Sequence, residues 1–171
     1  IVYANTHEQS NNPKLFQPLE AADYIFMGPG SPTYAVRHLA GSLLYKNIVE
    51  RVRAGASFAL ASAAVMAFSK LTLPVYEIYK AGLPLYWEHG LNFYSRIFRE
   101  LVVISHFNNN EGGKKNDTSR AWMGRKRFEK LLAMLPAPQK VWGIDEHTAV
   151  LINLQTKNIE TIGKGKLWQI R

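Results

Sequence analysis

Cysteine is absent from the 171-residue chain, which excludes disulfide scaffolds, cysteine-ligated zinc and a cysteine nucleophile. The longest mainly apolar stretch runs from residue 54 to residue 68, shorter than the roughly 20 residues of a membrane-spanning helix. No cleavable signal pattern opens the chain. Charged residues make up only 20%, too few for a disordered polyelectrolyte. We therefore expect a folded cytoplasmic protein without a membrane segment.

Lysine and arginine exceed aspartate and glutamate, and the formal net charge is +8. Such an excess can serve nucleic-acid binding. Here the basic residues are scattered, and their densest stretch, residues 114–127, contains no nucleic-acid motif. We expect a solvated basic face and no nucleic-acid partner. No compact histidine and carboxylate spacing of the H-E-x-x-H kind occurs, so we expect neither a metal nor another cofactor.

Short apolar runs alternate with helical periodicity over the first two-thirds of the chain. The pattern predicts strands over residues 24–27, 57–61, 100–105, 141–144 and 149–154, helices over 33–52, 63–68 and 121–135, and returning strands within 159–170. Such alternation is typical of an α/β domain of three layers. We expect a mainly parallel sheet with helices on both faces, of the flavodoxin-like kind, and antiparallel strands at its C-terminal edge.

Three chemically suggestive features follow predicted strands: the loop from Gly28 to Pro32, Ser62 and His106. The carboxyl ends of parallel strands gather ligand sites at one edge of the sheet, so these features should converge there. A serine at a strand-to-helix turn is typical of a nucleophile elbow, and a histidine at a strand end can act as a general base. Each also has a plain structural interpretation: a helix N-cap, a tight turn and a hydrogen-bonded loop histidine.

A serine and histidine pair needs a carboxylate that orients the imidazole. Glu77, Glu88 and Asp145 are the candidates, and their spacing does not decide among them. His147, which follows Asp145 and Glu146, is predicted to neighbour the site.

Four segments in this order resemble the peptidase E and cyanophycinase family of the class I glutamine amidotransferase-like superfamily. They are Phe26-Met27-Gly28-Pro29-Gly30-Ser31-Pro32, Ala59-Leu60-Ala61-Ser62-Ala63-Ala64-Val65-Met66, Ser105-His106-Phe107 with the segment 123–131, and Gly143-Ile144-Asp145-Glu146-His147-Thr148-Ala149. The resemblance spans roughly residues 20–155. It is strongest to the family's uncharacterised type 1 glutamine amidotransferase-like branch.

The resemblance implies a serine-type peptidase or amidohydrolase that acts on small peptides through an acyl-enzyme. It assigns Ser62 as the nucleophile, His106 as the base and Glu77 as the acid. The amides of Gly30 and Ala63 would form the oxyanion hole. It also implies that residues 1–171 form a single α/β hydrolase-like domain in which the family's first strand and helix are absent, and it leaves a homodimer open.

Two departures from the family pattern keep a second function open. Leu60 and Ala64 stand where the elbow usually has glycine, and a degenerate elbow fits a non-catalytic ligand-binding or protein-interaction member of the same fold. Leu60 is the bulkier of the two, and a left-handed backbone near it would be strained. Amidotransferase activity is not expected, because it would use a cysteine.

Overall fold

The first half of the chain forms a parallel strand pair joined by helices. The computed structural model describes residues 1–171, and in it β1 (Tyr24–Met27) pairs in parallel with β2 (Ser57–Leu60). The sequence predicted one helix between these strands. Instead there are two, α1 (Pro32–Leu39) and α2 (Leu43–Arg53). The prediction was wrong because Gly41 has a φ of 71°, and the Ser42 hydroxyl then accepts a hydrogen bond from the Tyr45 amide to begin α2.

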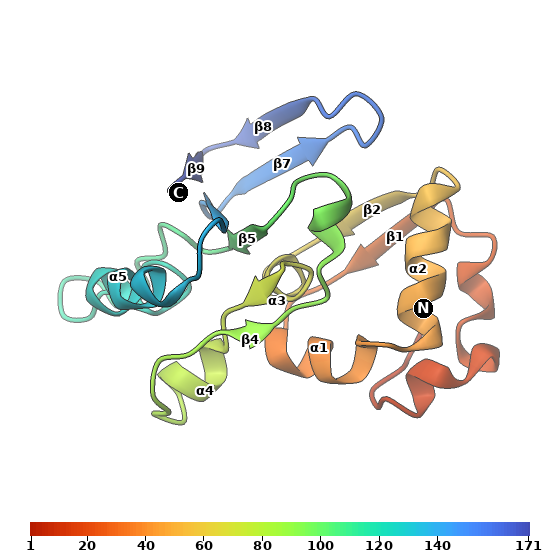
Figure 1. Ribbon diagram of the computed structural model, residues 1–171, viewed down its shortest axis with the longest axis horizontal. Helices are drawn as coiled ribbons and strands as arrows, with labels where there is room; N and C mark the ends of the chain where they lie inside the picture. Colours follow the sequence, from red (N-terminus) through yellow and green to blue (C-terminus); the bar gives the residue numbers. More distant parts are fainter.

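The remaining elements follow in a second α/β arrangement and a C-terminal antiparallel part (Figure 1). In chain order they are α3 (Ala63–Ala67), β3 (Leu71–Thr72), α4 (Val75–Tyr79), β4 (Glu88–His89), β5 (Leu101–Ile104), α5 (Gly124–Met134), β6 (Lys140–Ile144), β7 (Thr148–Ile152), β8 (Ile159–Gly163) and β9 (Leu167–Gln169). Short 3₁₀ helices lie at Gln9–Asn11, Pro13–Leu15, Gln17–Leu19 and Phe93–Arg96.

The predicted mainly parallel sheet is confirmed only in part. The pairs β1–β2 and β5–β6 are parallel, and the C-terminal strands β7, β8 and β9 pair antiparallel as expected. However, the strands form four small sheets rather than one continuous layer. The reason is visible beside β5, where the Lys70 amide donates to the Leu101 carbonyl and the Val103 amide donates to the Ser69 hydroxyl. The chain just before β3 therefore lies against β5.

Strand β5 separates two hydrophobic cores. Leu101 and Val103 pack into a cluster that contains Phe68, whereas Val102 and Ile104 pack into a cluster that contains Leu131 of α5. All four β5 residues are buried, which explains their uninterrupted apolar run. The strand leads directly to His106, so the two cores fix where that histidine emerges.

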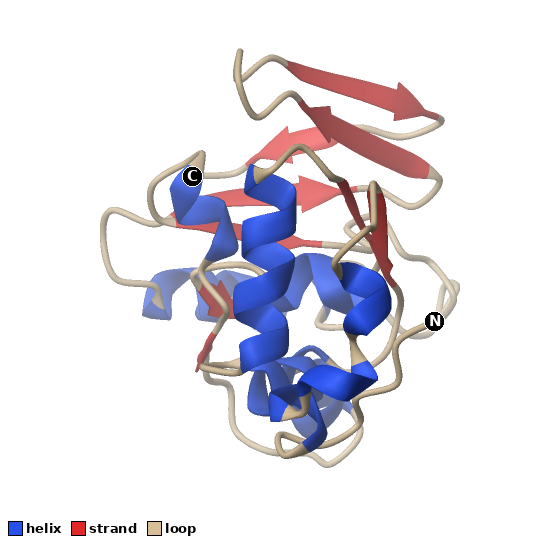
Figure 2. Ribbon diagram, turned by 90° about the vertical axis from the view of Figure 1, so that its right-hand side faces the viewer, coloured by secondary structure: helices blue, strands red, loops and turns tan.

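The C-terminal hairpin of β7 and β8 lies apart from the helices. Figure 2 shows the two strands above the helical part of the molecule, and every residue of β8 is exposed. None of the helices is both long and apolar enough to cross a lipid bilayer.

Candidate active site

The turn after β2 places Ser62 in an unusual backbone conformation. Ser62 has φ 55° and ψ −112°, a region that costs a residue other than glycine about 1–3 kcal/mol. Two hydrogen bonds hold this turn: the Ala61 amide donates to the Met27 carbonyl at 2.9 Å, and the Ser105 hydroxyl donates to the Ser62 carbonyl at 3.1 Å. A strained serine between a strand and a helix is the geometry of a nucleophile elbow.

The residues that replace the elbow glycines are accommodated without strain of their own. Leu60 is half-buried against the core cluster of Phe68, and the positive φ falls on Ser62, two residues later. Ala64 is buried inside α3. The missing glycines therefore do not prevent the turn from forming.

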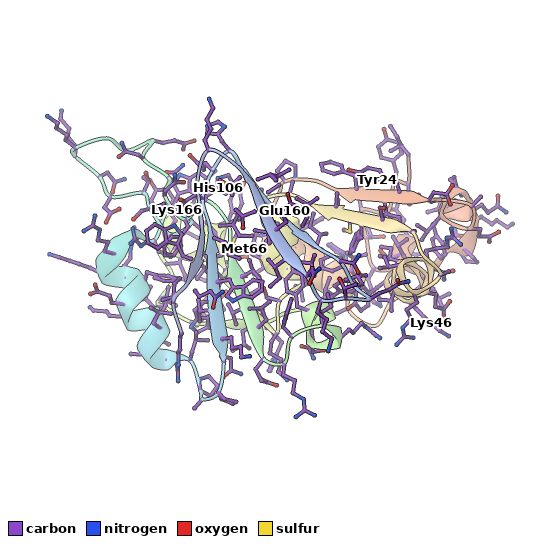
Figure 3. The ribbon with its side chains drawn as sticks, turned by 90° about the horizontal axis from the view of Figure 1, so that it is seen from above. Tyr24, Lys46, Met66, His106, Glu160 and Lys166 are labelled. Atoms are coloured by element: carbon purple, nitrogen blue, oxygen red, sulfur yellow. The ribbon has the colours of Figure 1, made fainter.

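His106 reaches the hydroxyl of Ser62. The Ser62 Oγ lies 2.8 Å from the His106 Nε2, within the hydrogen-bond reach expected of a nucleophile and its base. His106 has a φ of 51°, and the next amide, that of Phe107, donates to the Ile144 carbonyl at 3.0 Å. This bond joins the ends of β5 and β6, and thereby brings the loop after β6 beside the imidazole. Figure 3 shows His106 near the centre of the molecule, close in the view to Met66 of α3.

Glu146 is the carboxylate that hydrogen-bonds the second ring nitrogen of His106, Nδ1. Its Oε1 lies 2.8 Å from the His106 Nδ1 and accepts a second hydrogen bond from the Asn109 side-chain amide, also at 2.8 Å. The Glu146 amide donates to the Asn108 Oδ1 at 2.7 Å. Asn109 thus holds the carboxylate and Asn108 holds the backbone amide of Glu146. Ser62, His106 and Glu146 form a continuous hydrogen-bonded chain.

The surroundings of Glu146 favour its charged form. Partial burial acts to raise the pKa of its carboxyl group, but the hydrogen bonds from Asn109 and His106 and the charges of His106 and His147 outweigh burial. The net pKa lies below the ordinary value for glutamate. An ionised Glu146 holds the proton of His106 on Nδ1 and leaves Nε2 free to accept the proton of Ser62.

Glu77, which the resemblance assigned as the acid, does not meet His106. Its Oε1 accepts a hydrogen bond from the Thr33 hydroxyl, because α4 packs its Glu77 side chain toward the start of α1. The other two candidates are also elsewhere: Glu88 binds the neighbouring His89 amide on β4, and buried Asp145 accepts from the Trp168 indole and the Lys166 amide. The position expected for Glu77 is occupied by Glu146.

A cavity of about 430 Å³ opens beside the reactive pair. It is lined by Pro29, Gly30, Pro32, Ser62, Met66, Val75, Tyr76, Tyr79, Lys80, His106, Glu111 and Trp122. The amides of Gly30 and Ala63, the predicted oxyanion donors, make no hydrogen bond within the protein. Gly30 itself lines the cavity, and Ala63 is the first residue of the helix after Ser62. Both amides are therefore unpaired within the protein, and Gly30 and Ser62 line the same cavity.

Trp122 forms a wall of the cavity and packs on the imidazole. Its ring centroid lies 4.9 Å from that of His106, and its indole N–H donates to Glu111 at 3.2 Å. Arg120, Ala121 and Trp122 have φ values of 56°, 54° and 66°, so three consecutive residues adopt the left-handed conformation. The Ala121 amide donates to the His106 carbonyl at 3.2 Å, which ties this turn to the histidine.

Comparisons with known proteins agree with this geometry at the level of the fold. No protein-family model matches the sequence, and no curated protein matches it. Among solved structures, a peptidase from an acI-B1 Actinobacterium superposes with a TM-score of 0.64 at 21% identity, over 96% of this chain and 66% of its own. A candidate peptidase E protein from Listeria monocytogenes EGD-e gives a TM-score of 0.60 at 17% identity, over 90% and 65% respectively.

The chain has a peptidase E-like fold. It spans slightly less than two-thirds of the length of either solved protein. Within this peptidase E-like fold, no group of three or more histidine, aspartate or glutamate side chains is gathered in a way that could hold a metal ion.

Sequence reasoning missed Glu146, Asn108, Asn109 and Trp122 as parts of the site. A signal for Glu146 was present, because it follows the end of β6 just as Ser62 follows β2 and His106 follows β5. The segment that contains Glu146 also carried the resemblance to the peptidase E family. The asparagines lie in a polar loop. The segment from Asn109 to Gly113 resembles the type 1 glutamine amidotransferase-like branch, but that resemblance gave neither asparagine a role in the site.

Proposed function

We propose that the protein is a serine-type peptidase or amidohydrolase of the peptidase E family that acts on short peptides. The observation that carries this proposal is the chain from the Ser62 hydroxyl through the His106 imidazole to the Glu146 carboxylate, with both links at 2.8 Å. The peptidase E-like fold supports the same class of reaction. We favour catalysis over a non-catalytic binding role, because a serine with a strained backbone and a hydrogen-bonded base is costly to keep for binding alone.

The reaction would proceed by acyl transfer. His106 Nε2 accepts the proton of Ser62 while Oγ attacks the carbonyl carbon of the substrate amide. The amides of Gly30 and Ala63 would donate hydrogen bonds to the oxyanion that forms. The imidazolium, stabilised by Glu146, returns its proton to the leaving amine as the C–N bond breaks. Water, deprotonated by His106, then attacks the acyl-enzyme and releases the acid and Ser62.

The cavity supports a short peptide as the substrate. Its volume of about 430 Å³ is at the lower end of the range for small-molecule sites. Three aromatic side chains line it, together with one cation, Lys80, and one anion, Glu111. Neither charge forms an ion pair within the protein. A short free peptide carries an ammonium group and a carboxylate group that these two side chains would complement.

A fluorophosphonate probe, which reacts covalently with activated serines, tests the proposal. We expect it to label the wild-type protein and to fail on Ser62→Ala and His106→Ala. Ser95→Ala is the matched control, because Ser95 is exposed and lies outside the cavity. Equal labelling of wild type and Ser62→Ala, or no labelling of the folded wild type, would overturn the proposed function. A positive result justifies a screen of dipeptides with free termini.

A further inference from the structure

A line of hydrogen bonds connects Glu77 to the loop that holds Gly30. The Thr33 hydroxyl donates to the Glu77 Oε1, the Ser31 and Thr33 hydroxyl oxygens lie 2.9 Å apart, and the Tyr34 amide donates to the Ser31 Oγ at 3.2 Å. Ser31 is the residue after Gly30 and the N-cap of α1. The line therefore runs from α4 to the residue beside the predicted oxyanion donor.

The direction of each hydrogen bond in this line follows from the proton count. A hydroxyl group has one proton to donate, and Thr33 gives its proton to the Glu77 carboxylate. Ser31 must then donate its own proton to the Thr33 oxygen, which leaves the Ser31 oxygen free to accept from the Tyr34 amide. The Glu77 acceptor thus sets the orientation of both hydroxyl groups up to the start of α1.

The Glu77 side chain is placed at a cost that a purely structural contact would avoid. Its Oε2 is buried and has no hydrogen-bond partner, and an unsatisfied buried oxygen of this kind opposes folding. The same helix, α4, supplies Tyr76 and Tyr79 to the cavity wall. Glu77 consequently connects two parts of the cavity lining, the helix α4 with Tyr76 and Tyr79 and the loop with Gly30.

We propose that Glu77 is a positioning residue that acts through Thr33 and Ser31 to hold the Gly30 amide where the oxyanion of the substrate forms. The effect of Glu77 on catalysis rests on the proposed function, whereas its effect on the position of the loop rests on the hydrogen bonds alone. It differs from the role the sequence resemblance gave to Glu77, because Glu77 contacts neither His106 nor Ser62. A misplacement of a donor by about 1 Å can lower a reaction rate by about a hundredfold.

Two readouts test the proposal, one of them independent of catalysis. The first is the second-order rate of fluorophosphonate labelling, which we expect to fall by roughly ten- to a hundredfold in Thr33→Val and Glu77→Ala. Thr33→Ser and Glu77→Gln, which keep the hydroxyl and the acceptor oxygen, should retain most of the wild-type rate. The double variant Thr33→Val/Glu77→Ala should be no slower than the slower single variant, because both changes break one line.

The second readout is hydrogen exchange measured on peptides that cover residues 28–34. In Thr33→Val, exchange should accelerate in the peptides that cover residues 28–34 and stay unchanged in peptides from α5. The thermal unfolding midpoint is recorded for each variant. If the wild type is labelled, and Thr33→Val shows the same labelling rate and the same hydrogen exchange as the wild type, the proposal is overturned. A folded wild type that is not labelled would overturn the proposed function, and accelerated exchange in Thr33→Val would then still support the role of Glu77 in holding the loop.

Discussion

Replacing Glu146 by glutamine tests the carboxylate that the structure places against His106. Glutamine has nearly the same shape but carries no charge, and its amide can donate to the imidazole instead of accepting from it. The proton of His106 then moves to Nε2, and the protonated Nε2 can no longer accept the proton of Ser62. The Oε1 atom of Glu146 accepts hydrogen bonds from His106 and from Asn109, each at 2.8 Å. Loss of the carboxylate charge therefore disturbs His106 and Asn109 together.

The expected loss of activity is large and the expected loss of stability is small. An equivalent change in a serine-histidine-carboxylate site lowers turnover by about 10⁴-fold, and we expect about 10³- to 10⁴-fold here, which corresponds to about 4–5.5 kcal/mol. The side chains of His106 and Glu146 are 26% and 29% exposed, so water can replace part of the lost hydrogen bonding. We therefore expect the free energy of unfolding to fall by only about 1 kcal/mol.

The assay is the rate of fluorophosphonate labelling, followed by turnover once a substrate is found. Glu160→Gln is the matched control, since Glu160 is exposed on the β8 strand and takes no part in the hydrogen bonds of Ser62, His106 and Glu146. A labelling rate of Glu146→Gln within about tenfold of wild type would refute the assignment of Glu146 as the orienting acid.

The same variant has a pH signature with a definite sign. The folded-state pKa of Glu146 lies below its ordinary value of 4.5, so its ionised form stabilises the fold above that pH. This contribution is lost as the pH falls through the folded-state pKa. The stability difference between wild type and Glu146→Gln, measured by urea unfolding, should therefore shrink below pH 4.5. A difference that grows on acidification would contradict the hydrogen-bonding account.

Three further changes test other parts of the structure. Hydrogen bonds from the Ser119 hydroxyl and the Arg125 amide lower the pKa of Asp117 from 3.8 to about 2, so Asp117→Asn should cost about 1 kcal/mol after solvent screening, an effect present above pH 3.8 and lost toward pH 2 in urea titrations. In Gly143→Ala the new Cβ would lie 2.5 Å from the Phe107 ring, so thermal unfolding should show a loss of about 1–3 kcal/mol and labelling should slow, because Phe107 follows His106. Glu111→Gln should lower the preference for a dipeptide with a free amino group over its N-acetyl form by about tenfold in competition assays.

For each of these three substitutions, one result would contradict the expectation. A constant effect of Asp117→Asn between pH 6 and pH 2.5 would show that its carboxylate does not hold the start of α5. An unchanged unfolding midpoint in Gly143→Ala would mean that the Phe107 ring has room to move. An unchanged preference in Glu111→Gln would place the amino group of the substrate elsewhere in the cavity.

Local sequence was sufficient for the elements that carry the nucleophile and the base. The unbroken apolar run of β5 predicted a strand buried on both faces, and the structure confirms it. A lone serine directly after the apolar run of β2, followed by the small apolar residues that begin at Ala63, predicted the turn at Ser62. Both signals are local, because an apolar run and a change of residue type can be recognised from consecutive residues. The split between α1 and α2 was missed, although Gly41 and Ser42 mark it, because the helical periodicity continues across them.

The identity of the acid depended on the tertiary structure. Glu146 lies 40 positions after His106. It reaches the imidazole because β6 pairs in parallel with β5, and because Asn109 and Asn108 hydrogen-bond the carboxyl group and the backbone amide of Glu146. The family resemblance assigned Glu77 as the acid, but α4 packs that side chain toward Thr33 instead. The sequence by itself determined which residues end buried strands and so which hydroxyl and imidazole are exposed at one edge. Only the tertiary structure decided which carboxylate completes the site, because strand pairing and loop packing, rather than chain spacing, set the distance between residues so far apart.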